Sequence, residues 1–147
     1  TFPFDFIFRL RILGMNIMLF LGFLTFLYGS DNNQDLLEID LRERLVNDNQ
    51  IRIVVQIDNN SKREISKLEG FLLQINNKGN VISEKRITFL ELADGVLKPK
   101  QSVSKFIVFP LNQTRPDRYE FYVGKVRFRN DYRVYTYHPA IGFYRVD

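Results

Sequence analysis

From Ile51 to Asp58, isoleucine or valine occupies every second position, and few structures accommodate such a pattern. A β-strand points successive side chains to opposite faces, so a period of two places these residues together on one face. Branching at the β-carbon also favours an extended backbone. The Asn59-Asn60-Ser61 sequence that follows is typical of a turn. The segment is therefore predicted to be a strand with one face in a hydrophobic core.

Similar strand signals, separated by turn residues, recur through residues 36–147. They cover residues 68–75, 80–92, 103–109, 119–129, 132–138 and 140–146, while residues 36–41 fit either a strand or a short helix. Between two of them, Asn76-Asn77-Lys78-Gly79 predicts a hairpin in which Gly79 takes a positive φ. About seven strands with almost no helical periodicity predict an all-β domain. We expect an immunoglobulin-like antiparallel β-sandwich, with a closed barrel as the alternative.

One of these strand signals changes phase at Gly124. Before it, the residues at 119, 121 and 123 are apolar or aromatic, whereas after it Val126 and Phe128 are the apolar ones. One extra residue in a strand, a β-bulge, produces this slip, and glycine is well suited to the position. We therefore predict a bulge at Gly124.

The first 30 residues have a different composition from the rest of the chain. No charged residue occurs between Ile12 and Ser30, and the apolar run from 12 to 28 has the length of about 17 residues that a membrane-spanning helix needs. Arg9 and Arg11 precede the run and acids follow it, so the positive-inside rule places the N-terminus in the cytoplasm. The residues expected to lie in the membrane are Ile12, Leu19, Phe20, Leu21, Phe23, Leu24, Phe26 and Leu27.

Three interpretations of this N-terminal segment, residues 1–30, stay open. It is an uncleaved membrane anchor, a secretory signal removed near Gly29-Ser30, or a buried core helix. In the first two, a polar linker at residues 31–35 leads to a domain at 36–147 on the extracytoplasmic side, in a periplasm or at a cell surface. Cleavage would release that domain as a secreted or periplasmic protein. Met15 also allows translation to start after residue 14.

The composition excludes several kinds of chemistry. The 147 residues include no cysteine and one histidine, which excludes disulfides, thiol nucleophiles, thiolate zinc sites and paired-histidine metal motifs. His138 is the one candidate general base, and no nucleophile can be assigned beside it. We therefore expect no catalytic residues, no metal and no cofactor. The net charge of +4 is too small to predict specific nucleic-acid binding.

Three segments combine strand and turn residues in a characteristic order: VVQIDNNS at 54–61, FLLQINNKGNVI at 71–82 and LKPKQSVSKF at 97–106. Together they resemble the small extracytoplasmic immunoglobulin-like modules called FxLYD domains and, more distantly, the water-stress late-embryogenesis domains. The naming motif falls on Leu72, Gln74, Ile75 and Asn76 without an identical residue, and Lys100 stands where glycine is usual. The resemblance implies a binding or assembly module outside a membrane, without catalytic residues.

Basic and aromatic residues gather around the turn predicted at Asn130-Asp131. Alternation places the cations of the first strand on one face, and the turn brings the residues of the next strand beside them. Arginine and tyrosine are frequent in protein interfaces. We therefore expect a protein-docking face, with anionic lipid or another polyanion as alternative partners and an ordinary solvated surface as the structural alternative. This basic hairpin face consists of Lys125, Arg127, Arg129, Arg133, Tyr135 and Tyr137.

The sequence thus predicts a non-enzymatic interaction or assembly module that is membrane-anchored or exported. A subunit or accessory of a larger membrane-associated complex fits this description. The alternative is a ligand-binding sandwich that holds a lipid or small apolar molecule between sheets lined by Phe89, Phe106, Phe109 and Phe121. An enzyme using His138 is the third hypothesis.

Two tripeptides match the N-glycosylation acceptor pattern, Asn59-Asn60-Ser61 and Asn112-Gln113-Thr114. Both lie in predicted turns. They matter for a chain made in a eukaryotic secretory pathway, where exposed asparagines in loops are modified.

Overall fold

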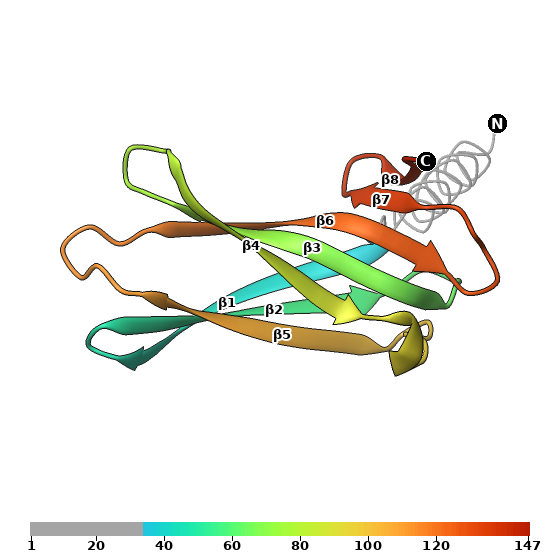
Figure 1. Ribbon diagram of the computed structural model, residues 1–147, viewed down its shortest axis with the longest axis horizontal. Coiled ribbons are helices and arrows are strands. Elements are labelled where there is room, and N and C mark those ends of the chain that lie inside the picture. The colour runs from blue at the N-terminus through green and yellow to red at the C-terminus, as the bar shows by residue number, and fades with distance from the viewer. Residues whose placement is uncertain (1–33) are drawn as a thin grey trace, which may run out of the picture. The chain divides into compact units, whose positions relative to one another are not determined.

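A computed structural model describes residues 34–147 as two antiparallel β-sheets that pack face to face (Figure 1). The predicted membrane segment and residues 31–33 of the linker lie outside the described residues. The sheets have the strand orders β1-β2-β5 and β4-β3-β6-β7-β8. The elements are β1 Leu37–Asn47, β2 Gln50–Asn59, β3 Ile65–Ile75, β4 Val81–Leu90, the 3₁₀ helix η1 Leu92–Asp94, β5 Ser102–Pro110, β6 Arg118–Phe128, β7 Tyr135–His138 and β8 Gly142–Arg145.

This architecture confirms the prediction of an all-β domain. The described strands number eight rather than about seven, and they form two separate sheets instead of the closed barrel that was the alternative. Among residues 34–147, no helix has the length and apolar composition needed to cross a membrane.

The hydrophobic core lies between the two sheets. In β2 the predicted row from Ile51 to Ile57 is buried at every second residue, with exposed fractions of 6% or less. Leu68 and Leu72 of β3 face this row from the other sheet, and their side chains are fully buried. The period of two in the sequence therefore identified the core face of β2 correctly.

Residues 36–41, which fit either a strand or a short helix, belong mostly to strand β1. Leu37 is buried, and Ile39 and Leu41 are half-buried, while Glu38 and Asp40 between them are exposed. Because β1 pairs with β2 along its length, the alternation follows the buried face of a strand.

The predicted hairpin joins β3 to β4, and its turn has the expected chemistry. Gly79 has a φ of 83°, a conformation that costs glycine little because it has no β-carbon. The Oδ1 atom of Asn76 accepts the backbone N–H groups of Lys78 at 3.0 Å and Asn80 at 2.9 Å. The hairpin and the positive φ are both confirmed.

The predicted bulge at Gly124 is also confirmed. Glu69 of β3 pairs with Lys125 of β6, but Gly70 pairs with Val123, so Gly124 is the extra residue. The side chains after the bulge therefore change faces, as the phase slip in the sequence indicated.

The last predicted strands need one correction. The segment predicted as a strand from 132 to 138 becomes extended at Tyr135, because residues 131–134 take an irregular path around the side chain of Asp131. The final strand, β8, lies within the predicted range 140–146. β7 contacts β6 through the pair Val126–Tyr135 and continues into an antiparallel pair with β8.

Asn59 shows that a glycosylation pattern is not always an accessible acceptor. Its side chain is fully buried, and its amide nitrogen donates to the carbonyl oxygens of Arg63 at 2.8 Å and Leu97 at 3.1 Å. Its amide oxygen accepts the backbone N–H of Ser61 at 3.1 Å. Asn59 is therefore not accessible as an acceptor in the folded domain, whereas Asn112 is exposed.

Candidate functional site

The cations of the basic hairpin face lie on the outer surface of β6 and at the turn that follows it. Lys125 and Arg129 are exposed and Arg127 is half-buried, whereas Val126 and Phe128 between them face the core. The alternation predicted for these five residues is therefore confirmed. Arg133 is also exposed, just beyond the turn.

The two tyrosines of the predicted face lie differently. Tyr137 is only 5% exposed, its ring centroid lies 5.1 Å from that of Phe143, and burial raises the pKa of its hydroxyl. Tyr135 is half-buried, with its ring edge-to-face against Phe128 at 5.2 Å. Tyr135 pairs directly with Val126, whose side chain points inward, so Tyr135 and Tyr137 point inward as well. The irregular path of residues 131–134 therefore changes which alternate residues of this segment face the core. Placing Tyr137 on the exposed face was therefore wrong.

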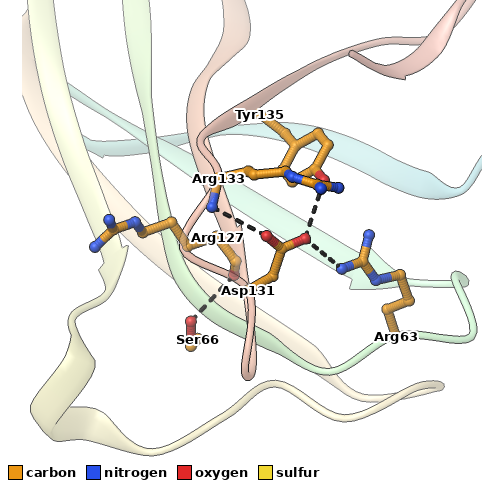
Figure 2. Close-up of polar contacts among 6 residues, drawn as sticks. All are labelled: Arg63, Ser66, Arg127, Asp131, Arg133 and Tyr135. Atoms are coloured by element: carbon orange, nitrogen blue, oxygen red, sulfur yellow. Dashed lines mark hydrogen bonds and ion pairs between the residues drawn. The ribbon is translucent and has the colours of Figure 1, made fainter. Parts of the chain in front are cut away.

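Asp131 organises the turn between β6 and β7 (Figure 2). Its Oδ1 accepts the backbone N–H of Arg133 at 3.0 Å. Its Oδ2 accepts an N–H of Arg63 at 2.9 Å and the hydroxyl of Tyr135 at 2.9 Å. These donors, the N–H of Arg133 first, lower the pKa of Asp131 from 3.8 to about 2. The carboxylate is thus charged at neutral pH, and its four-residue network fixes the turn.

Arg63 joins this turn to the loop between β2 and β3. Its guanidinium lies over the ring of Phe128 at 3.7 Å from the centroid and over Tyr135 at 5.7 Å, while it pairs with Asp131. A cation over an aromatic face and beside a carboxylate is held by two independent attractions. Arg63 therefore acts mainly as a structural tie between the two loops.

The remaining cations differ in how many partners they have within the chain. Arg129 pairs with Glu64 at 2.8 Å, and Lys125 is 3.9 Å from Glu69. Arg127 donates to the carbonyl oxygen of Tyr132 at 3.2 Å, while its Nε is buried without an acceptor among the described residues. The contacts of Arg127 and Arg129 hold these two cations near the turn, whereas Lys125 lies beside the bulge.

Arg133 is the cation with the most freedom to meet a partner. It makes no ion pair with any residue from 34 to 147. Its guanidinium lies beside the hydroxyl of Tyr135 (Figure 2), and this contact raises the pKa of Arg133. The group is charged at any physiological pH and keeps donor atoms available.

A shallow surface pocket of about 400 Å³ opens at this turn. Three arginines and one carboxylate line it, so its field is positive in spite of the ion pairs. Tyr132 at its rim is 91% exposed, an unusual position for an aromatic side chain with no contact to protect it. The lining residues are Arg63, Arg129, Asn130, Asp131, Tyr132 and Arg133.

Sequence reasoning missed the parts that Arg63, Asp131 and Tyr132 play in this site. The sequence placed Asp131 in a turn. Its carboxylate accepts the backbone N–H of the residue two positions later, Arg133, which is the hydrogen bond of an Asx turn. The contribution of Arg63 had no local signal, because it lies 68 residues before Asp131 in the chain.

The other predicted sites gain little from the structure. His138 is exposed, and its Nδ1 accepts the backbone N–H of Ala140 at 3.1 Å. Within residues 34–147, no group of three or more histidines and carboxylates is arranged to hold a metal ion. Phe89 and Phe121 pack edge-to-face at 5.7 Å, and Phe106, 57% exposed, lies on the outer face of its sheet. Phe106 therefore cannot line a cavity between the sheets.

We compared the chain with protein-family models, with curated proteins and with solved structures, and no match was found in any of the three comparisons.

Proposed function

We propose that the chain is a non-enzymatic interaction module, held at or exported across a membrane by its N-terminal segment, that docks a protein partner through the basic hairpin face. The observation that carries this proposal is the set of exposed cations around a turn that Asp131 fixes. Arg133 and Tyr132 complete a docking surface of donors and an aromatic side chain beside a positive pocket. Because Tyr137 is buried and Arg127 and Tyr135 are half-buried, the residues of this face that meet the partner are Lys125, Arg129, Tyr132 and Arg133.

The chemistry of this face favours a partner with carboxylate groups. A guanidinium binds a carboxylate through two parallel N–H donors, and Arg133 has donors available for such a pair. The fixed turn reduces the entropy lost on docking, because the backbone between β6 and β7 is already ordered. Positive charge around the pocket also speeds the encounter with an acidic surface.

We propose further that the domain is an immunoglobulin-like sandwich of the FxLYD kind. The support is its strand order, in which β2 and β5 pair in one sheet while β3, β6 and β7 are neighbours in the other. Immunoglobulin-like sandwiches pair strands B and E in one sheet and C, F and G in the other. Such modules commonly serve recognition at cell surfaces, which agrees with an interaction role.

The experiment is partner capture from membranes by the full chain. The test variant changes Lys125, Arg129 and Arg133 to serine, and it keeps Arg127 because that side chain is half-buried and bonded to a backbone carbonyl. The matched control changes Lys98, Lys105 and Arg115, three exposed cations elsewhere, to serine. Quantitative mass spectrometry after cross-linking measures the captured proteins.

We expect the test variant to capture at least about tenfold less of its partner, since arginine is frequent among the few interface residues whose truncation costs over about 1 kcal/mol. The control should retain it. Equal capture by wild type and both variants, with unchanged thermal unfolding, would show that the face is a solvated surface. Binding of the wild type to anionic vesicles, in place of a protein, would assign the face to lipid headgroups.

A further inference from the structure

The outer face of the three-stranded sheet, on the side away from the core, has a regular composition. Along β2 its residues alternate with the core row, and each has a directly opposite neighbour on β1 and on β5. Directly paired residues of antiparallel strands project from the same face. Between Arg52 and Asp58, the outer β1-β2-β5 face therefore has four rows: Arg44–Arg52–Val108, Arg42–Val54–Phe106, Asp40–Gln56–Ser104 and Glu38–Asp58–Ser102.

This outer face is divided into two halves of opposite charge. The first two rows contain three arginines and all of the apolar side chains, and they have no acid. The last two rows contain three carboxylates and no base. The face is therefore complementary to itself after a half-turn.

We propose that this face binds the same face of a second copy of the chain and forms a two-fold symmetric dimer. A two-fold axis in the interface, crossing the strands midway between the second and third rows, places each row of one copy on its mirror row in the other. Arg44 then lies opposite the second copy's Glu38, Arg42 opposite Asp40, and Arg52 opposite Asp58. Every arginine of the face then lies opposite a carboxylate; Arg42 already pairs with Asp40 of its own copy at 3.0 Å, so the new ion pairs are those of Arg44 and Arg52.

The single copy leaves like charges side by side, which the second copy relieves. Arg44 is directly opposite Arg52, and Glu38 is directly opposite Asp58. Like charges at directly opposite positions on paired strands are destabilising. An opposite charge from the second copy offsets each of these repulsions.

Apolar surface in the basic half adds to the attraction. Phe106 is 57% exposed and Val108 is 39% exposed, and the guanidinium of Arg52 lies 4.5 Å above the ring of Phe106. In the dimer Phe106 lies against Ser104 of the second copy beside the axis, and Val108 lies against its Ser102 farther from the axis. Removing this apolar area from water favours association.

The size of the face predicts a weak dimer. Three strands about 4.8 Å apart and seven residues with a rise of about 3.4 Å give a face of roughly 15 by 25 Å. This is below the roughly 800 Å² that each partner buries in a standard interface. We therefore expect a dimer that dissociates on dilution. The isologous contact also closes on itself, so it does not propagate into fibres.

The experiment measures the mass of the full chain in detergent micelles by native mass spectrometry at several protein concentrations. One variant carries Arg44→Glu and Arg52→Asp, which leaves Arg42 as the one base in its four rows. The other carries Glu38→Arg and Asp58→Arg, which leaves Asp40 as the one acid in its four rows. The matched control, Lys98→Glu with Arg115→Glu, changes two exposed cations in loops outside the strands.

We expect the wild type and the control to shift with concentration from 17.5 kDa to twice that mass. Neither face variant should dimerise alone, whereas an equal mixture of the two should form a heterodimer. Restored pairing would also show that both variants are folded. A wild type that stays monomeric, face variants that dimerise like the wild type, or a mixture that stays monomeric would each overturn the proposal.

Discussion

At the scale of single residues, Lys100 has a backbone conformation that residues with a β-carbon rarely adopt. Its φ is 68°, a left-handed conformation in which a β-carbon costs roughly 1–2 kcal/mol. Its N–H donates to the carbonyl oxygen of Asn59 at 2.7 Å, so the connection into β5 holds it there. Glycine, which stands at this position in the family that the sequence resembles, has no such cost.

We therefore expect Lys100→Gly to raise the free energy of unfolding by about 0.5–1 kcal/mol, after the greater entropy of glycine in the unfolded chain is subtracted. Urea unfolding followed by circular dichroism measures this change. The control, Lys98→Gly, removes an exposed lysine without positive φ and should lower stability or leave it unchanged. A Lys100→Gly variant less stable than the wild type would show that the lysine side chain stabilises the connection.

Asp131 gives a residue-scale prediction about pH. Its pKa is about 2 in the folded domain and 3.8 ordinarily, chiefly because the N–H of Arg133 and then Arg63 donate to the carboxylate. A carboxyl with a lowered pKa stabilises the fold fully above its unfolded pKa, and this stabilisation is lost as pH falls through the folded pKa. The wild type should therefore exceed Asp131→Asn in urea midpoint at pH 6. The excess should shrink between about pH 4 and pH 2, and an excess that does not change over this range would contradict the assignment.

At the scale of elements, two glycines allow β3 and β6 to pair closely around the bulge. A β-carbon on Gly70 would lie 2.3 Å from Cζ of Phe121 and 2.5 Å from the backbone oxygen of Tyr122. A β-carbon on Gly124 would lie 2.8 Å from Cε2 of Phe71, a half-buried side chain that can turn away. The backbone neighbour of Gly70 has no such freedom.

We expect Gly70→Ala to lower the free energy of unfolding by about 1–3 kcal/mol, as for overpacked core positions. Gly124→Ala should cost less than about 1 kcal/mol. The two variants make a matched pair, measured by urea unfolding under one set of conditions. Equal losses of unfolding free energy would indicate that the bulge, and not the contact between the strands, determines how much an added β-carbon destabilises the domain.

The strands differ in how far local sequence predicts them, and the reason is physical. In β2 one face is buried and the other is not, so apolar residues occur at every second position. In β6 the same alternation shifts by one residue at Gly124, which indicates the bulge. The start of β7 had no such signal, because Asp131 and its contact with Arg63 determine the path of residues 131–134. The inward orientation of Tyr137 follows from that path and was missed for the same reason.

At the scale of the whole molecule, the strands and the β3–β4 hairpin were predictable, but the order of strands in the two sheets was not. Turn residues mark where each strand ends, whereas the order of strands depends on contacts between distant segments. Ile53 of β2 pairs with Ile107 of β5, and Leu68 of β3 pairs with Val126 of β6. The exposed cations of the site were likewise predicted from alternation, but their partners Glu64 and Glu69 come from the region of β3 and lacked a local signal.

These distant pairings have a kinetic consequence. The hairpins β1–β2 and β3–β4 close over short turns, but each sheet is completed only when a strand from about fifty residues farther along the chain arrives. Domains dominated by such non-local pairing fold on times of roughly milliseconds to seconds. During synthesis β2 emerges well before β5, with its isoleucine row open to water. For that interval the strand that later forms the centre of the core exposes an apolar row, and apolar surface exposed in this way is prone to aggregate.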